Sequence, residues 1–110
     1  MIIFIYIYYI AMKIIEIIDS PRKGKKYRAI FDDGDTIDFG LKGSSTYLDH
    51  HDKVKRKAYW ARHYANNTER ELLHWIVRSP ATLSAFILWG TTTDLKKNVD
   101  ELNDLWANSI

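Results

Sequence analysis

Between residues 13 and 39, apolar and polar positions alternate, which predicts three β-strands over residues 13–19, 26–32 and 35–39. The segment 20–24 between the first two strands has proline early and glycine late, as expected of a turn. Asp33-Gly34, between the second and third strands, is a two-residue hairpin signal. The pattern therefore predicts a small antiparallel meander, whose inward side chains are Tyr27, Ala29, Phe31, Ile37 and Phe39.

From residue 48 the apolar positions recur at helical spacing, and capping residues divide the segment into successive helices. The first predicted helix begins near Leu48 or Asp49, with Asp49 as a candidate N-cap, and ends at Asn66-Asn67. The second, running through Val77, begins with Thr68 as N-cap and Glu71 three positions later, as in a capping box.

Two further helices follow. Ser79 and Pro80 are a cap and a first helical residue, and Gly90 is a stop signal. Residues 81–89 are apolar nearly all round, which predicts a helix that is central or covered by a partner. The apolar face of the last predicted helix consists of Leu95, Val99, Leu102 and Trp106.

The predicted fold is α+β: a small antiparallel β-meander followed by three to four α-helices packed on one side, with an apolar N-terminal arm. The 110 residues are enough for one domain with a modest core. We therefore divide the chain into an arm over residues 1–12 and a single α+β domain over residues 13–110.

The arm is the most apolar part of the chain, and in it Phe4, Tyr6 and Tyr8 alternate with isoleucines. This period of two predicts a strand that is buried on both faces. The 11 apolar residues from Ile2 to Met12 would make only about 16 Å of helix, half of a hydrocarbon core about 30 Å thick. We therefore expect an arm covered by other subunits or by sheet pairing.

An anchor against an internal membrane is the alternative for this arm. Extending a helix to spanning length would bury Lys13 and Glu16, which is costly. The basic start and small-residue cleavage site of a signal peptide are missing. Met12 is a candidate alternative start.

The first predicted helix has two distinct faces. Val54, Ala58, Ala61 and Ala65 form a stripe of small side chains that predicts close packing against the sheet or another helix. Another face combines aromatic with basic residues, namely Trp60 and Tyr64 with Lys53, Arg56 and Lys57. Such a face is typical of a protein interface, with nucleic-acid binding as the alternative.

Charge is balanced overall and uneven locally. The 16 Lys and Arg against 14 Asp and Glu give a net charge of +2, which does not indicate a nucleic-acid binder. The predicted turn is nevertheless strongly basic, and its interface candidates are Arg22, Lys23, Lys25 and Lys26. We expect this turn to form a charged rim or an anion-facing loop. The sequence contains no cysteine, which excludes disulfides and thiol chemistry.

Three clusters are candidates for chemistry. Gly40 and Gly43 beside Lys42 suit left-handed backbone at the end of the sheet, with a phosphate-binding nest as the alternative. Adjacent His50, His51 and Asp52, together with His63, are metal-ligand types without a recognised spacing. The carboxylates near the hairpin are explained by turn chemistry, and they are Asp32, Asp33, Asp35 and Asp38. We expect a non-enzyme without cofactor or metal.

Residues 39–63 carry a recognisable pattern, FGxKGxSxY followed by an H-x-D step and an RK…Y…RH helix. The pattern resembles that of a family of small proteins encoded by large, chlorella-virus-like DNA viruses of algae, and the likeness runs from about Lys13 to the closing DELNDLW at Asp100 to Trp106. This resemblance implies a virion component without catalytic activity, most plausibly a minor capsid protein.

The expected role is thus to cement neighbouring capsid subunits through protein–protein contacts, in the virion and, during assembly, in the host cytoplasm. The expected partners are other capsid proteins. An internal viral membrane is a further candidate partner through residues 1–12. The alternative is a small virus-encoded protein that binds nucleic acid through its basic clusters and aromatic residues.

Overall fold

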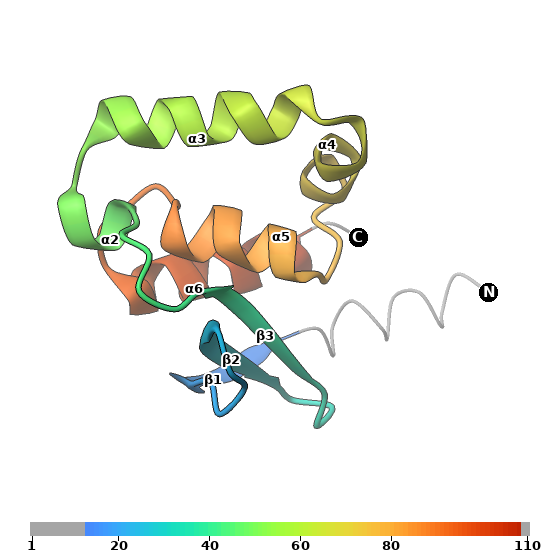
Figure 1. The fold of residues 1–110 in the computed structure, drawn as a ribbon. Coiled ribbons are helices and arrows are strands. Elements are labelled where there is room, and N and C mark those ends of the chain that lie inside the picture. Colours follow the sequence, from blue (N-terminus) through green and yellow to red (C-terminus); the bar gives the residue numbers. More distant parts are fainter. Residues whose placement is uncertain (1–12, 109–110) are drawn as a thin grey trace.

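A computed structural model describes residues 13–108, and it confirms the α+β fold. An antiparallel sheet in the order β1-β2-β3 comes first, and the helices that follow lie on one side of it (Figure 1). The strands are β1 (Ile14–Asp19), β2 (Lys25–Phe31) and β3 (Thr36–Leu41). Each predicted strand is therefore found, with bounds shifted by two residues at most.

The hairpin between β2 and β3 is confirmed, but its loop is one residue longer than the sequence signal predicted. Phe31 N donates to Asp35 O at 2.9 Å, and Gly34 N donates to Phe31 O at 3.0 Å, so the loop spans residues 32–34. Gly34 has a φ of 89°, the left-handed conformation that closes a three-residue hairpin loop. The Asp33 carboxylate accepts from Asp35 N at 3.0 Å, which stabilises this longer loop.

The helical part begins with α2 (Tyr47–His50) and α3 (Lys53–Ala65). It continues with α4 (Asn67–His74), with α5 (Pro80–Leu83) and the π-helical turn η1 (Ser84–Leu88) that extends it, and ends with α6 (Leu95–Ala107). Figure 1 shows α5 and α6 between the sheet and α3. Helix α3 is therefore the outermost layer.

The prediction of one helix over residues 48–66 is wrong, because His51 interrupts it with a φ of 55°. Asp49 is not an N-cap. Its carboxylate accepts from Thr46 N at 2.8 Å, which makes it the third residue of a capping box around α2. Asp52 then caps α3 by accepting from Val54 N at 2.9 Å. Two capping carboxylates this close together stabilise two helix starts instead of one.

Asn66 is the N-cap of α4, two residues earlier than the predicted cap Thr68. Its side chain accepts from Glu69 N at 3.0 Å. Asparagine is at least as good a cap as threonine, and it is also the residue at which α3 ends. The predicted start at Ser79-Pro80 is confirmed, since Ser79 Oγ accepts from Thr82 N at 3.2 Å.

The core lies between the sheet and the α5–η1–α6 layer. Its sheet side is formed by Ile14, Ala29, Phe31 and Phe39, and Tyr27 and Ile37 pack against it, so the predicted inward face is confirmed. The helical side consists of Leu83, Ile87, Leu88, Val99, Leu102 and Trp106. The predicted apolar face of the last helix is thus confirmed, with Leu95 at its margin.

Side chains of α6 connect this helix to the rest of the fold through hydrogen bonds. The Asn103 amide accepts from Ile14 N and donates to Ile14 O, both at 2.9 Å, as a neighbouring strand would. Trp106 is fully buried, and its Nε1 donates to Ile76 O at 2.7 Å. The final helix is therefore held against both the sheet and the segment after α4.

Candidate functional site

Helix α3 faces the molecule with its large side chains, and its small-residue stripe faces solvent. Val54 is 78% exposed, and Ala58, Ala61 and Ala65 are exposed too. The prediction that this stripe packs closely is therefore wrong. Rings bury far more apolar surface than alanine methyl groups, so turning the aromatic face inward is the more favourable arrangement.

Arg56 and Trp60 reach from α3 to the end of η1. Arg56 Nε donates to the carbonyl oxygens of Gly90 at 2.6 Å and Trp89 at 3.2 Å. Trp60 Nε1 donates to Trp89 O at 2.8 Å. The last carbonyls of a helix have no intrahelical partner, and a cation there also interacts favourably with the helix dipole. These two predicted interface residues are thus engaged within the chain.

Aromatic contacts reinforce the same junction. The Tyr59 ring is stacked on the Trp89 ring, with centroids 4.4 Å apart and an interplanar angle of 5°. The Trp60 and Phe86 rings meet edge to face at 5.2 Å. Both geometries are favoured arrangements of ring quadrupoles. As a result, α3 is held on η1 by rings, and a hollow is left beside them.

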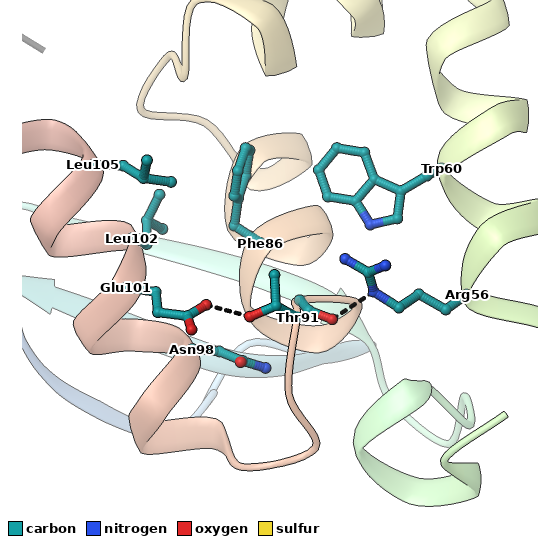
Figure 2. A pocket seen from close by; sticks show the side chains of 9 residues that line it. Arg56, Trp60, Phe86, Thr91, Asn98, Glu101, Leu102 and Leu105 are labelled. Carbon is teal, nitrogen blue, oxygen red and sulfur yellow. Dashed lines mark hydrogen bonds between the residues drawn. The ribbon is translucent and has the colours of Figure 1, made fainter. Parts of the chain in front are cut away.

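This hollow, the α3–α6 pocket, has a volume of about 330 Å³. Figure 2 shows Trp60 and Arg56 on its α3 side, Phe86 from η1 in the middle, and Leu102 and Leu105 on its α6 side. The remaining lining residues are Gly90, Thr91, Asn98 and Glu101. The pocket therefore combines apolar walls with two charged side chains, Arg56 and Glu101, that come from opposite sides.

The loop under the pocket is rigidly held. Asn98 is fully buried, and its Nδ2 donates to Ile87 O at 2.8 Å and to Thr92 O at 2.9 Å. Its Oδ1 accepts from Thr92 Oγ1 at 2.7 Å. A Cβ atom at Gly90 would lie 2.3 Å from Phe86 O, so this position has no room for any other residue. The Thr91 hydroxyl donates to the Glu101 carboxylate, which holds that acid on the rim.

The other interface candidates on α3 do not line the α3–α6 pocket. Lys53 and Lys57 are exposed, and neither makes a salt bridge within residues 13–108. Tyr64 is 38% exposed, with its ring centroid 6.2 Å from that of Trp60. The structure thus splits the predicted basic–aromatic face into an inward part, Arg56 and Trp60, and an outward remainder.

The basic turn between β1 and β2 is joined by a lysine from farther along the chain. Lys42 N donates to Gly24 O at 3.0 Å, and a hollow of about 230 Å³ lies between the two segments. Among the cations that line it, Lys26 is engaged, since its Nζ donates to Ser44 O at 2.8 Å and lies 3.5 Å from the Asp49 carboxylate. Lys25 and Lys42 have no such partner in the described part of the chain, and Arg22 and Lys23 are exposed.

The pair formed by His63 and Glu69 was not predicted. His63 Nδ1 bonds to the Glu69 carboxylate across the α3–α4 junction, where the residues are six apart in sequence. The sequence signal that could have revealed this pair is a predicted helix boundary with a histidine before it and a glutamate after it. The centroid of the adjacent Tyr59 ring lies 4.1 Å from that of the His63 ring. Burial raises the pKa of Tyr59 to about 12, and the negative charge of Glu69 contributes to this increase.

The remaining candidates for chemistry are occupied by structural contacts. His50 Nδ1 accepts from Asp52 N at 3.0 Å. Arg28 bonds to the Asp38 carboxylate through Nε at 2.9 Å, and Arg78 bonds to both Asp33 and Asp35. Within residues 13–108, no group of three or more histidine, aspartate or glutamate residues is arranged to hold a metal ion.

Part of the predicted interface lies outside the described residues. This part is the arm over residues 1–12, with Phe4, Tyr6 and Tyr8. Among the helices of residues 13–108, none combines the length and apolarity needed to cross a membrane.

Comparison with known proteins yields one partial match. The profile of a family described as a family of unknown function (DUF5754) matches residues 15–63, which run from β1 to the end region of α3. No curated protein and no solved structure matches the chain. The matched segment includes Arg56 and Trp60 but none of the residues that η1 and α6 contribute to the α3–α6 pocket.

Proposed function

We propose that this chain is a structural virion component, a minor capsid protein that cements neighbouring capsid subunits through protein–protein contacts. The support from sequence is the resemblance carried by residues 39–63 to small proteins of large DNA viruses of algae. The support from structure is that large apolar side chains remain exposed on the surface. Monomeric proteins rarely retain contiguous apolar surface without a binding role.

The observation that carries the proposal is the outer edge of β1. The strand order leaves this edge without a neighbouring strand in residues 13–108. Ser20 N donates to Lys26 O at 3.2 Å, so the alternation of an antiparallel strand turns the N–H and C=O groups of Ile17 and Asp19 outward. Within the described residues, the start of the edge at Ile14 is covered by the Asn103 amide.

The side chains along this edge strengthen the case. Ile15 is 61% exposed and Ile18 is 37% exposed. A hollow of about 260 Å³ separates the strand from α6 and includes Ile15 and Ile17 in its lining. An unpaired, apolar edge is a template for strand addition by another chain. The apolar residues 1–12, with Phe4, Tyr6 and Tyr8, directly precede this strand in sequence, and we assign them to the same interface.

The test is a doubly charged edge, Ile15→Lys with Ile18→Lys. Lysine on an edge strand opposes pairing with another chain, while both positions are exposed enough to tolerate it. Incorporation into purified virus particles, measured by mass spectrometry, should fall by about tenfold or more. Val54→Lys, at a 78% exposed position on α3, is the matched control and should incorporate normally. Normal incorporation of the double variant would contradict the proposal.

A second candidate function, nucleic-acid binding, is favoured by the position of Lys42. Its backbone contact with Gly24 adds a cation to a turn that already carries Arg22, Lys23 and Lys25. Clustered cations displace counterions from phosphates, so the affinity for DNA should fall steeply with salt. Changing Arg22, Lys23 and Lys25 to Gln should flatten that salt dependence, and Lys26 is kept because it bonds to Ser44. A salt dependence equal to that of the unmodified protein would exclude this turn as the binding surface.

A further inference from the structure

We propose that the α3–α6 pocket binds a small apolar carboxylate, whose anionic head is held by Arg56 and whose apolar body lies against Trp60, Phe86 and the leucines of α6. The inference goes beyond the proposed capsid role and does not depend on it. It rests on the orientation of one arginine, on the apolar walls beside it and on the acid at the opposite rim.

The arginine is already fixed in place. Arg56 Nε is used by the carbonyls of Gly90 and Trp89, at 2.6 and 3.2 Å, and the guanidinium is planar, so these bonds also orient its two Nη groups. Neither Nη makes a hydrogen bond or ion pair in the described part of the chain. Figure 2 shows this group beneath the Trp60 indole. Carboxylates bind such pre-oriented N–H pairs through parallel, charge-assisted hydrogen bonds.

The walls beside the guanidinium suit an apolar body. The edge-to-face pair of Trp60 and Phe86 lies on one side, and Leu102 and the partly exposed Leu105 come from α6. The volume of about 330 Å³ is at the lower end of the range of small-molecule sites. Asn98 and Gly90 hold the floor, so the site needs no rearrangement to admit a ligand of this size.

Glu101 makes the two ends of the pocket opposite in charge. Its carboxylate is held on the α6 side by the Thr91 hydroxyl, opposite Arg56 (Figure 2). A second negative charge at that end would be repelled, so the site favours one anionic head with an uncharged tail over a dicarboxylate. Neutralising Glu101 should therefore strengthen the binding of an anion, whereas neutralising Arg56 should weaken it.

The experiment uses the full chain and four probes: hexanoate, hexanamide, adipate and acetate. Binding is followed by NMR at the Trp60 indole N–H, which lies beside the pocket. Hexanoate should bind roughly tenfold more tightly than hexanamide, since a hydrogen bond to a charged group contributes more than a neutral one. Acetate lacks the apolar body and adipate carries a second charge, so both should bind more weakly than hexanoate.

Substitutions test whether Arg56 and Glu101 determine the binding of hexanoate. Arg56→Gln should reduce hexanoate binding roughly tenfold, to the level of hexanamide. Glu101→Gln should increase it by roughly two- to fivefold, because Glu101 is exposed. Arg62→Gln, an exposed cation elsewhere on α3, is the matched control and should change nothing. If Arg56→Gln fails to fold, two measurements still test the proposal. They are the comparison of hexanoate with hexanamide in the unmodified chain and the binding of hexanoate by Glu101→Gln. Equal binding of hexanoate and hexanamide, or weaker hexanoate binding by Glu101→Gln, would overturn the proposal.

Discussion

The Trp60 indole N–H donates to the backbone carbonyl of Trp89 at 2.8 Å, and this bond helps to join the outermost helix to the end of the π-helical turn. Arg56 shares the same carbonyl at 3.2 Å. Because α3 contains no fully buried residue, its attachment depends on such specific contacts more than on a continuous apolar seam. This relationship sets the first prediction.

Trp60→Phe should keep most of the ring contact with Phe86 and remove the hydrogen bond to Trp89. The expected loss is about 1 kcal/mol in the free energy of unfolding, measured by urea denaturation. Trp75→Phe is the control, because Trp75 is 65% exposed and its indole donates to the exposed side chain of Glu71 in α4. Equal stability of the Trp60 variant and the unmodified chain would mean that Arg56 alone secures this carbonyl.

Gly90→Ala should be the most destabilising of the glycine substitutions. The added Cβ would lie 2.3 Å from Phe86 O and 2.8 Å from Asn98 Cγ, so backbone or a buried amide must move. A loss of about 2 kcal/mol or more is expected by thermal or urea unfolding.

Gly43→Ala separates this steric effect from conformational strain. Gly43 has a φ of 85°, and a Cβ atom there meets nothing within 4 Å. Its substitution should therefore cost only about 1 kcal/mol, the cost of a left-handed non-glycine residue. If Gly43→Ala were instead more destabilising than Gly90→Ala, the loop after η1 would have shifted to make room for the added Cβ atom.

Asp38 should make stability depend on pH in the acid range. Hydrogen bonds from Arg28, and then from Ser20, lower the pKa of its carboxyl from 3.8 to about 2. Because the folded pKa is the lower one, the stabilisation is complete above the unfolded value and is lost as the pH falls toward about 2.

The measurement is denaturant unfolding of Asp38→Asn and of the unmodified chain across this range. The variant should be less stable near neutral pH, and the difference should shrink between the two pKa values. Asp32→Asn, at an exposed position in the neighbouring loop, is the matched control for replacing an aspartate by an asparagine. A stability difference that is independent of pH would assign the effect to packing instead of charge.

Deletion of residues 1–11 tests the predicted arm. A chain that starts at Met12 retains every described strand and helix, so it should remain folded, as judged by circular dichroism. It should also be more soluble, since the deleted segment is the most apolar in the chain. If the arm belongs to the capsid interface, the truncated chain should fail to enter virus particles. Normal incorporation of the truncated chain would refute the prediction that the arm belongs to this interface.

Local signals predicted the fold better than they predicted the candidate pocket. Ser79-Pro80 was recognised correctly because a cap and its first helical residue are neighbours in sequence. The start of α4 was placed two residues late, because Asn66 and Thr68 are both acceptable caps and the choice depends on where α3 ends. The α3–α6 pocket was not predicted, because its walls come from three separate helical segments.

The sequence by itself determined the features that depend on residues close together in the chain. These are the alternation that makes Phe31 and Phe39 core residues, the hairpin at Asp33-Gly34, and the buried face of α6 that ends at Trp106. Each follows from the period of a strand or helix, or from the backbone preferences of one or two residues. These features could therefore be predicted without knowledge of the tertiary contacts.

Only the tertiary structure decided which face of α3 points inward. From the sequence, its small-residue stripe was predicted to pack against the sheet or another helix, and its aromatic–basic face was predicted to contact a partner. The outcome depended on the unpaired carbonyls of Trp89 and Gly90, which lie about 30 residues away and accept from Trp60 and Arg56. A helix buries the face whose partners are available, and those partners are defined only when the chain has folded.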